Sequence, residues 1–171
     1  PHASIAFEVL AAPDGRPGPA GLDEVLLQFT ANPGESARPL QKIASGGELS
    51  RVMLALKSSL QTRDRVDVLV FDEVDSGIGG AVAQAVGERL RDLAQHRQVI
   101  CVTHLPVIAA LGRHHFAVSK QVANGRTVAR IDVLESRGRV EELARMLAGE
   151  RVTDTTRRQA RELLASPAND D

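Results

Sequence analysis

The stretch that most constrains this chain is residues 66–80, with the sequence VDVLVFDEVDSGIGG. Its apolar run, Val68 to Phe71, contains only β-branched, Leu and aromatic residues and stops at two adjacent carboxylates, Asp72 and Glu73. A short unbroken apolar run predicts a strand buried on both faces of a parallel sheet. The carboxylates are then expected at the carboxyl end of the strand, where open α/β sheets bind ligands. The alternative is a core strand that ends at a solvated acidic turn.

The residues after this strand indicate a helix and then a second strand. Gly79 and Gly80 open the helix, and a second apolar run follows at residues 98–103. A strand, a helix and a strand in this order form a βαβ unit with parallel strands and a right-handed crossover. The predicted fold class is therefore α/β, with a parallel sheet core flanked by helices. The apolar side of the helix, expected to be buried, consists of Val82, Val86, Leu90 and Leu93.

The remaining segments complete one expected domain, residues 1–165, followed by a flexible polar tail at residues 166–171. An N-terminal antiparallel strand pair is expected at residues 4–10 and 25–30, joined by a loop rich in proline and glycine. Further along the chain the pattern predicts a helix from residue 45, with apolar Leu49, Val52, Met53, Leu56 and Leu60. A short helix is expected at 105–111, and strands are expected at 114–119 and 127–134. Two further helices are expected around 140–147, closed by Gly149, and at 155–165.

Composition narrows the possible functions. The 171 residues carry 21 Lys and Arg against 22 Asp and Glu, so no whole-chain field attracts nucleic acid or anionic lipid. Trp and Tyr are absent, which argues against a base-stacking surface. No apolar run approaches the ~18 residues of a membrane span. The single Cys101 indicates no disulfide framework, so the cytoplasm is the expected location. The first residue is Pro1 rather than Met, which favours a piece of a longer chain.

Residues 45–48, with the sequence SGGE, have two interpretations. Ser45 followed by Glu48 three residues later forms a capping box, which is a common helix start. Glycine, however, costs up to about 1 kcal/mol relative to alanine within a helix. Gly46 and Gly47 therefore favour a place where a ligand approaches the backbone. Because the first turn supplies free N–H groups and the positive end of the helix dipole, the expected ligand is an anion.

Three side chains at the expected sheet edge suit phosphoryl chemistry. Asp72 can hold Mg²⁺, which prefers oxygen ligands and retains several waters. Glu73 points the other way and can orient or deprotonate a water that attacks a γ-phosphate. His104 follows the second strand directly; such a histidine is usually a surface or capping residue, but at this edge it can reach the same phosphate. No Cys and His spacing resembles a zinc site, and no G-x-S-x-G occurs.

Three motifs in this order resemble the C-terminal half of an ABC-type ATPase head. Residues 44–48 resemble the signature motif, residues 68–73 the Walker B strand with its catalytic glutamate, and residues 102–104 the switch-histidine loop. The finer resemblance is to the RecN family of SMC-like DNA repair ATPases, and it covers nearly the whole chain. It is carried by NPG at 32–34, KIASGGELSR at 42–51, FDEVDSGIGG at 71–80 and THLP at 103–106.

This resemblance implies roles for single residues. Glu73 and His104 are then catalytic, and Asp72 binds Mg²⁺. The residues implied to bind the γ-phosphate of ATP on a second head are Ser45, Gly46, Gly47 and Glu48.

Two departures from the general ABC pattern limit what can be carried over. The signature ends in Glu48 where transporters usually have Gln, which is the SMC-like form. The D-loop aspartate of other ABC proteins would fall near Gly79, so only the loop at residues 74–79 is carried over and Asp75 receives no firm role.

The sequence contains no G-x-x-x-x-G-K-[ST], so the chain cannot cradle a triphosphate in the usual way. In SMC-like proteins this Walker A lobe comes from the N-terminal end of the polypeptide, before a long antiparallel coiled coil. The resemblance thus implies three partners: that lobe, a second head engaged through ATP, and DNA bound by the full-length protein during double-strand-break repair and recombination. The chain is expected to be the C-terminal lobe of the head, inactive alone, without membrane association, in the cytoplasm at the bacterial nucleoid.

Two alternatives stay open at this point. A transporter-type ABC ATPase usually has a helical subdomain before the signature, where this chain has expected strands, and Pro in place of Val74. A regulatory head that binds nucleotide without turnover would not need two crowded acids, each of which raises the pKa of the other. DNA contact by Arg157, Arg158 and Arg161 is a further possibility, although a charged helix face is usually only solvated.

Overall fold

The computed structural model describes residues 3–11, 15–19, 21–30, 32, 34–42, 45–60, 66–123, 125–149 and 151–165. The described chain forms two compact units, residues 1–49 and 50–171. Pro33, Ile43 and Ala44, and the expected tail at residues 166–171, lie outside the described residues.

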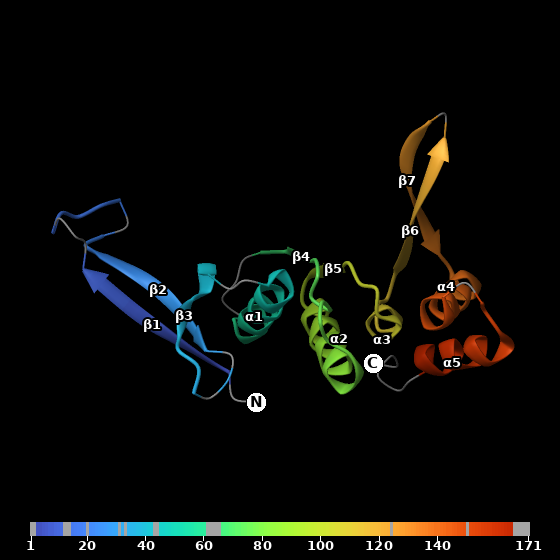
Figure 1. The fold of residues 1–171 in the computed structure, drawn as a ribbon, viewed down its shortest axis with the longest axis horizontal. Coiled ribbons are helices and arrows are strands. Elements are labelled where there is room, and N and C mark those ends of the chain that lie inside the picture. Colours follow the sequence, from blue (N-terminus) through green and yellow to red (C-terminus); the bar gives the residue numbers. More distant parts are fainter. Residues whose placement is uncertain are drawn as a thin grey trace. The chain divides into compact units, whose positions relative to one another are not determined.

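The first unit is a small antiparallel sheet (Figure 1). Strands β1 (Ser4–Ala11) and β2 (Asp23–Thr30) pair over their full length, which confirms the predicted N-terminal strand pair. A short third strand, β3 (Arg38–Pro39), pairs with the far end of β2 and leads into a 3₁₀ turn, η1 (Leu40–Lys42). The sequence between residues 35 and 44 shows no clear period, so neither short element was predicted.

The second unit contains the predicted βαβ motif. Strands β4 (Val68–Phe71) and β5 (Gln98–Cys101) pair in parallel, with Val68 opposite Gln98 and Phe71 opposite Cys101. Helix α2 (Gly80–Ala94) connects them and begins at the predicted glycine pair, with Gly79 as its N-cap. The α/β class and the parallel pair are confirmed.

Burial on both faces of the first strand was predicted wrongly. Leu69 and Phe71 are 8% and 5% exposed, whereas Val68 and Val70 are 46% and 65% exposed. The reason is that only one face of the strand pair packs on a core. This first core cluster contains Leu54, Leu69, Phe71, Val74, Ala83, Val86, Leu90, Leu93 and Ile108.

The helices around this cluster show which of the apolar positions picked out from the sequence are buried. Helix α2 is buried along Ala83, Val86, Gly87, Leu90 and Leu93, and Val82 lies one position off this stripe, 55% exposed. Helix α1 (Gly46–Ser59) forms at the predicted place, and its residue in the first core cluster is Leu54. Of the apolar positions predicted for this helix, Val52 is buried and Met53 is 36% exposed.

A glycine permits the close approach of the next helix. Helix α3 (Pro106–Ala110) follows the second parallel strand and packs against α2. A Cβ atom added to Gly87 would lie 2.6 Å from Leu111 Cδ1 and 3.5 Å from Ile108 Cα. The first distance is shorter than real Cβ contacts, so a larger residue at this position would require the Leu111 side chain to shift, whereas the second is an ordinary van der Waals contact.

The rest of the second unit is a hairpin and two helices (Figure 1). Strands β6 (His115–Ala123) and β7 (Arg126–Leu134) pair antiparallel around a turn with Gly125 at φ 72°. Helices α4 (Ser136–Ala148) and α5 (Asp154–Leu164) follow, as the sequence predicted. Gly149, at φ 68°, donates its N–H to Arg145 O at 2.8 Å and closes α4 in the expected C-cap position. The helices share a second core cluster made of Ala110, Leu143, Ala144 and Ala160.

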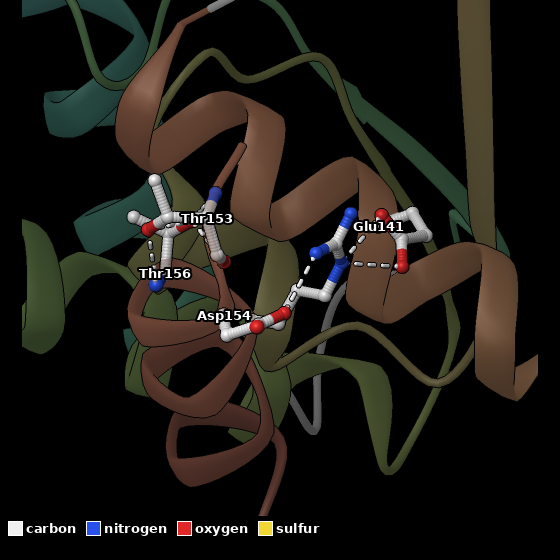
Figure 2. A network of polar contacts seen from close by, with 5 residues as sticks. Glu141, Thr153, Asp154 and Thr156 are labelled. Carbon is white, nitrogen blue, oxygen red and sulfur yellow. Dashed lines mark hydrogen bonds and ion pairs between the residues drawn. The ribbon is translucent and has the colours of Figure 1, made fainter. Parts of the chain in front are cut away.

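Polar contacts fix the start of α5 (Figure 2). Thr153 and Thr156 form a capping box, in which each side-chain hydroxyl accepts a hydrogen bond from the backbone N–H of the other residue. Arg157 Nε lies 2.9 Å from Glu141 Oε1 on α4, and its Nη1 lies 3.0 Å from Asp154 Oδ1. Arg157 therefore joins two helices. None of the helices in the described part of the chain is long and apolar enough to cross a membrane.

The second core cluster predicts that replacing a leucine of α4 with alanine lowers the free energy of unfolding by an amount that depends on its position. Leu143 is fully buried, whereas Leu147, one turn later, is 39% exposed. Leu143→Ala should lower the free energy of unfolding by about 2–5 kcal/mol, because it leaves a cavity. Leu147→Ala, the same change in the same helix, should cost at most about 1 kcal/mol. Urea unfolding of both variants measures the difference, and equal losses would contradict this packing.

Candidate functional site

The loop after β4 carries the two adjacent carboxylates predicted from the sequence. Asp72 and Glu73 are both exposed at the end of the strand. Glu73 has φ 57°, and it is the one non-glycine residue with positive φ in the described chain. A left-handed backbone costs roughly 1–2 kcal/mol for a residue with a Cβ. Such strain is found preferentially at functional sites, where the surrounding structure holds it in place.

Side chains of α1 hold the backbone of this loop. Ser50 Oγ donates to Asp72 O at 2.7 Å. Arg51 Nη1 donates to Val74 O at 3.2 Å and to Ser76 O at 2.9 Å. These hydrogen bonds satisfy three backbone carbonyl groups of the loop. The carboxylates of Asp72 and Glu73 remain at the surface, where they can meet a ligand.

Asp75 connects this loop to the loop after the neighbouring strand. Its side chain is buried, and its Oδ2 accepts hydrogen bonds from Thr103 Oγ1 at 2.5 Å and from the His104 backbone N–H at 2.8 Å. The same oxygen lies 3.0 Å from His104 Nδ1, at ion-pair distance. The strands also align here, since Val102 N donates to Phe71 O at 2.9 Å. The loop after β4 and His104 therefore meet at one edge of the parallel pair.

The sequence pattern assigned no role in the site to Asp75 or Thr103. The structure brings the Asp72 and Glu73 loop and His104 together as expected for neighbouring parallel strands, but the contact runs through Asp75. The available signal was an acid in the turn after one strand and a Thr-His pair at the end of the next. Nothing in the sequence showed that this acid is buried.

The surroundings shift the pKa values of two side chains near the strand edge, Asp75 and Cys101. Burial opposes ionisation of Asp75, but the hydrogen bonds from Thr103 Oγ1 and the His104 backbone N–H, together with the coulombic effect of the His104 ring, outweigh it and lower the pKa of this carboxyl. Burial raises the pKa of the Cys101 thiol to about 12, assisted by the negative charges of Asp75 and Asp72. Cys101 therefore stays a thiol and is no nucleophile.

The start of α1 has the geometry of a helix cap. Glu48 N lies 3.4 Å from Ser45 Oγ, and Leu49 N donates to Ser45 O at 3.1 Å. Gly46 is exposed and Gly47 is buried. The first turn of any helix has backbone N–H groups without intrahelical partners, so this end can receive an anion. Ser45 to Glu48 belong to the first unit, whereas Ser50 and Arg51 of the same helix belong to the second.

The donor groups at the strand edge fit Mg²⁺ only together with a phosphate ligand. In the described part of the chain no three His, Cys, Asp or Glu side chains gather closely enough to hold a metal by themselves. Mg²⁺ in nucleotide sites needs one or two carboxylates, and waters and phosphate oxygens complete the octahedron. Exposed Asp72 meets that need.

The lowered pKa of Asp75 predicts a pH-dependent contribution to stability. Asp75→Asn should cost roughly 1–3 kcal/mol near pH 7, because the charge-assisted hydrogen bonds are lost. A carboxyl with a lowered folded pKa stabilises the protein above its ordinary value of 3.8, and this advantage disappears as the pH falls through the folded pKa. Unfolding of both proteins from about pH 7 down to about pH 1 measures it, because the loss begins near the ordinary value and continues below it. A pH-independent difference would contradict an ionised Asp75.

Comparison with known proteins places this site in a family context. No family model matches the chain. It is 53% identical over 165 residues to the DNA repair protein RecN of Deinococcus radiodurans, which covers 96% of the chain and 28% of that protein. It is 50% identical to RecN of Treponema pallidum over 90% of the chain and 27% of that protein, and 46% identical to RecN of Bacillus subtilis over 84% and 25%. The chain thus spans about a quarter of these relatives' length.

Solved structures similar to the chain are SMC heads. The Smc head of Pyrococcus yayanosii superposes with a TM-score of 0.59 at 22% identity, over 84% of this chain and 26% of that one. The Smc head of Pyrococcus furiosus gives 0.54 at 19% identity, over 83% and 33%. At these identities the likeness concerns the fold alone. The chain is therefore a RecN-type sequence, and its α/β fold agrees with the C-terminal lobe of an SMC-type head.

Proposed function

We propose that this chain is the hydrolytic lobe of an SMC-like ATPase head that acts in bacterial DNA double-strand-break repair and recombination. The observation that carries the proposal is the meeting of the Asp72 and Glu73 loop with His104 through Asp75. Support for the biological role comes from the RecN relatives, which are DNA repair proteins. A solved SMC structure similar in fold was studied for ATP-driven dimerization, with a TM-score of 0.51 and 17% identity.

The residues at the strand edge divide the reaction between them. Asp72 holds Mg²⁺, which neutralises charge on the phosphate oxygens of ATP when it is bound. Glu73 orients an attacking water and accepts its proton. His104 donates Nε2–H to the γ-phosphate, because its Nδ1 faces Asp75 and 72% of its side chain is exposed. These three residues act on nucleotide bound to their own head.

The start of α1 serves the other head. Ser45, Gly46, Gly47 and Glu48 contact the γ-phosphate of ATP held by a second copy. The exposed Gly46 and the capped first turn support this assignment. An anion then finds its last N–H partners only when two heads meet. ATP binding engages the heads, and hydrolysis releases them.

The uncovered face of the parallel pair supports a Walker A lobe as partner. Its four apolar residues Val68, Val70, Ile100 and Val102 are 46%, 65%, 46% and 57% exposed. A contiguous apolar face of this kind marks an interaction surface. The Walker A lobe of the same polypeptide covers it and brings the phosphate loop that this sequence lacks. DNA binds to the full-length protein, in the cytoplasm at the nucleoid.

Replacing the proposed base tests the function directly. Glu73→Gln in the intact protein should keep ATP binding but lower kcat by about 10²- to 10⁴-fold, because the water loses its proton acceptor. Asp67→Asn, an exposed carboxylate just before the other end of the same strand, is the matched control and should leave kcat unchanged. Steady-state ATPase assays and nucleotide binding measure both. Unchanged turnover in Glu73→Gln would refute the role of Glu73.

A charge at the start of α1 tests the second nucleotide contact. Ser45→Arg should prevent ATP-dependent head dimerisation, because a bulky side chain fills the space of the phosphate, while ATP binding to the single head persists. Ser59→Arg places the same side chain at the other end of the same helix and should dimerise normally. Light scattering with and without ATP separates the two variants. ATP-dependent dimerisation of Ser45→Arg would count against contact in trans.

A further inference from the structure

Asp75 makes contacts that a turn residue does not need. A single Asx-type bond is enough to shape a turn, yet this carboxylate receives the side chain of Thr103 and both the backbone and the ring of His104 on the same oxygen. It is 3% exposed, so these donors replace most of its water. A buried carboxylate is tolerated only when it is paired in this way.

The contact fixes which ring nitrogen of His104 carries a proton. An ionised carboxylate can only accept hydrogen bonds. The 3.0 Å contact to Asp75 Oδ2 therefore requires a proton on Nδ1. The other nitrogen, Nε2, is then the one presented to a ligand. The hydrogen bond of one ring nitrogen sets the state of the other.

Thr103 has a different part in the same network. Its Oγ1 donates to Asp75 and accepts from Leu105 N at 3.0 Å, so it shapes the turn that leads into α3. Among the residues that the structure describes, Asp75 is the ion-pair partner of the His104 ring. A role of Asp75 in the turn and a role toward the ring can therefore be separated by substitution.

We propose that Asp75 is a positioning residue for His104, which holds the ring with Nδ1–H toward its carboxylate so that Nε2–H donates to the γ-phosphate. This inference rests on the proposed function of His104 and adds to it a residue outside the Asp72 and Glu73 pair. It also couples the loop that carries Glu73 to the ring, because Asp75 lies in the same turn, where Ser76 N donates to Glu73 O at 2.9 Å.

A double-mutant cycle in the intact protein tests the coupling. Asp75→Asn should lower kcat by up to about 100-fold, the loss produced by misplacing a reacting group by about 1 Å, with ATP affinity unchanged. In a His104→Gln background the same substitution should have little further effect, because there is no ring left to position. Thr103→Val, which removes the hydroxyl but leaves the Asp75 contact to His104, should retain most of the turnover.

A spectroscopic measurement tests the orientation without relying on activity. In protein labelled with ¹⁵N-histidine, the His104 signals are identified by their loss in His104→Gln. The wild-type ring should carry a proton on Nδ1. In Asp75→Asn the carboxylate charge that holds this proton is gone, so the fraction of rings protonated on Nδ1 should fall.

The outcomes are distinguishable. Equal kcat losses from Asp75→Asn in the native and the His104→Gln backgrounds, or no loss in the native one, would overturn the inference. A wild-type ring protonated only on Nε2 would also overturn it, even where a variant fails to fold. Unchanged kcat in His104→Gln would instead refute the proposed function of His104, and the NMR result would still decide whether Asp75 sets the ring's orientation.

Discussion

The site depends on one oxygen of Asp75, which accepts two hydrogen bonds and lies at ion-pair distance from the His104 ring. Parallel strands bring their carboxyl ends to the same edge, but they do not fix the loops that follow. Here one buried charge lies between the two loops, and its donors replace the water that burial removes. The loop after β4 and the loop after β5 therefore hold their shapes together.

The same division of labour recurs around the site. Side chains that face inward hold backbone: Ser50 and Arg51 bind carbonyls of the loop after β4, and Arg139 of α4 donates to Gly112 O at 2.6 Å, just after α3. Side chains that face outward, such as Asp72 and Glu73, are left free for chemistry. The helix after His104 is thus held from two sides, by the close approach at Gly87 and by Arg139.

Sequence patterns predicted the parts that depend on local rules. The apolar run at Val68 to Phe71, the glycine pair before α2 and the C-cap at Gly149 appear at the expected positions. The failures concern tertiary context. Burial of Val68 and Val70 depends on what covers the second face, and the role of Asp75 depends on a partner 29 residues away. The roles of Asp72, Glu73, His104 and Ser45 stay predictions that rest on motif and geometry.

The backbone at Glu73 has a consequence for which amino acid can occupy that position. At φ 57° the residues that fit with least strain are glycine, asparagine and aspartate, and β-branched residues fit worst. Folding alone would therefore not select glutamate, which has neither the freedom of glycine nor the short polar side chain that stabilises this conformation locally. A glutamate at this position therefore points to a function of its side chain rather than to a requirement of the fold.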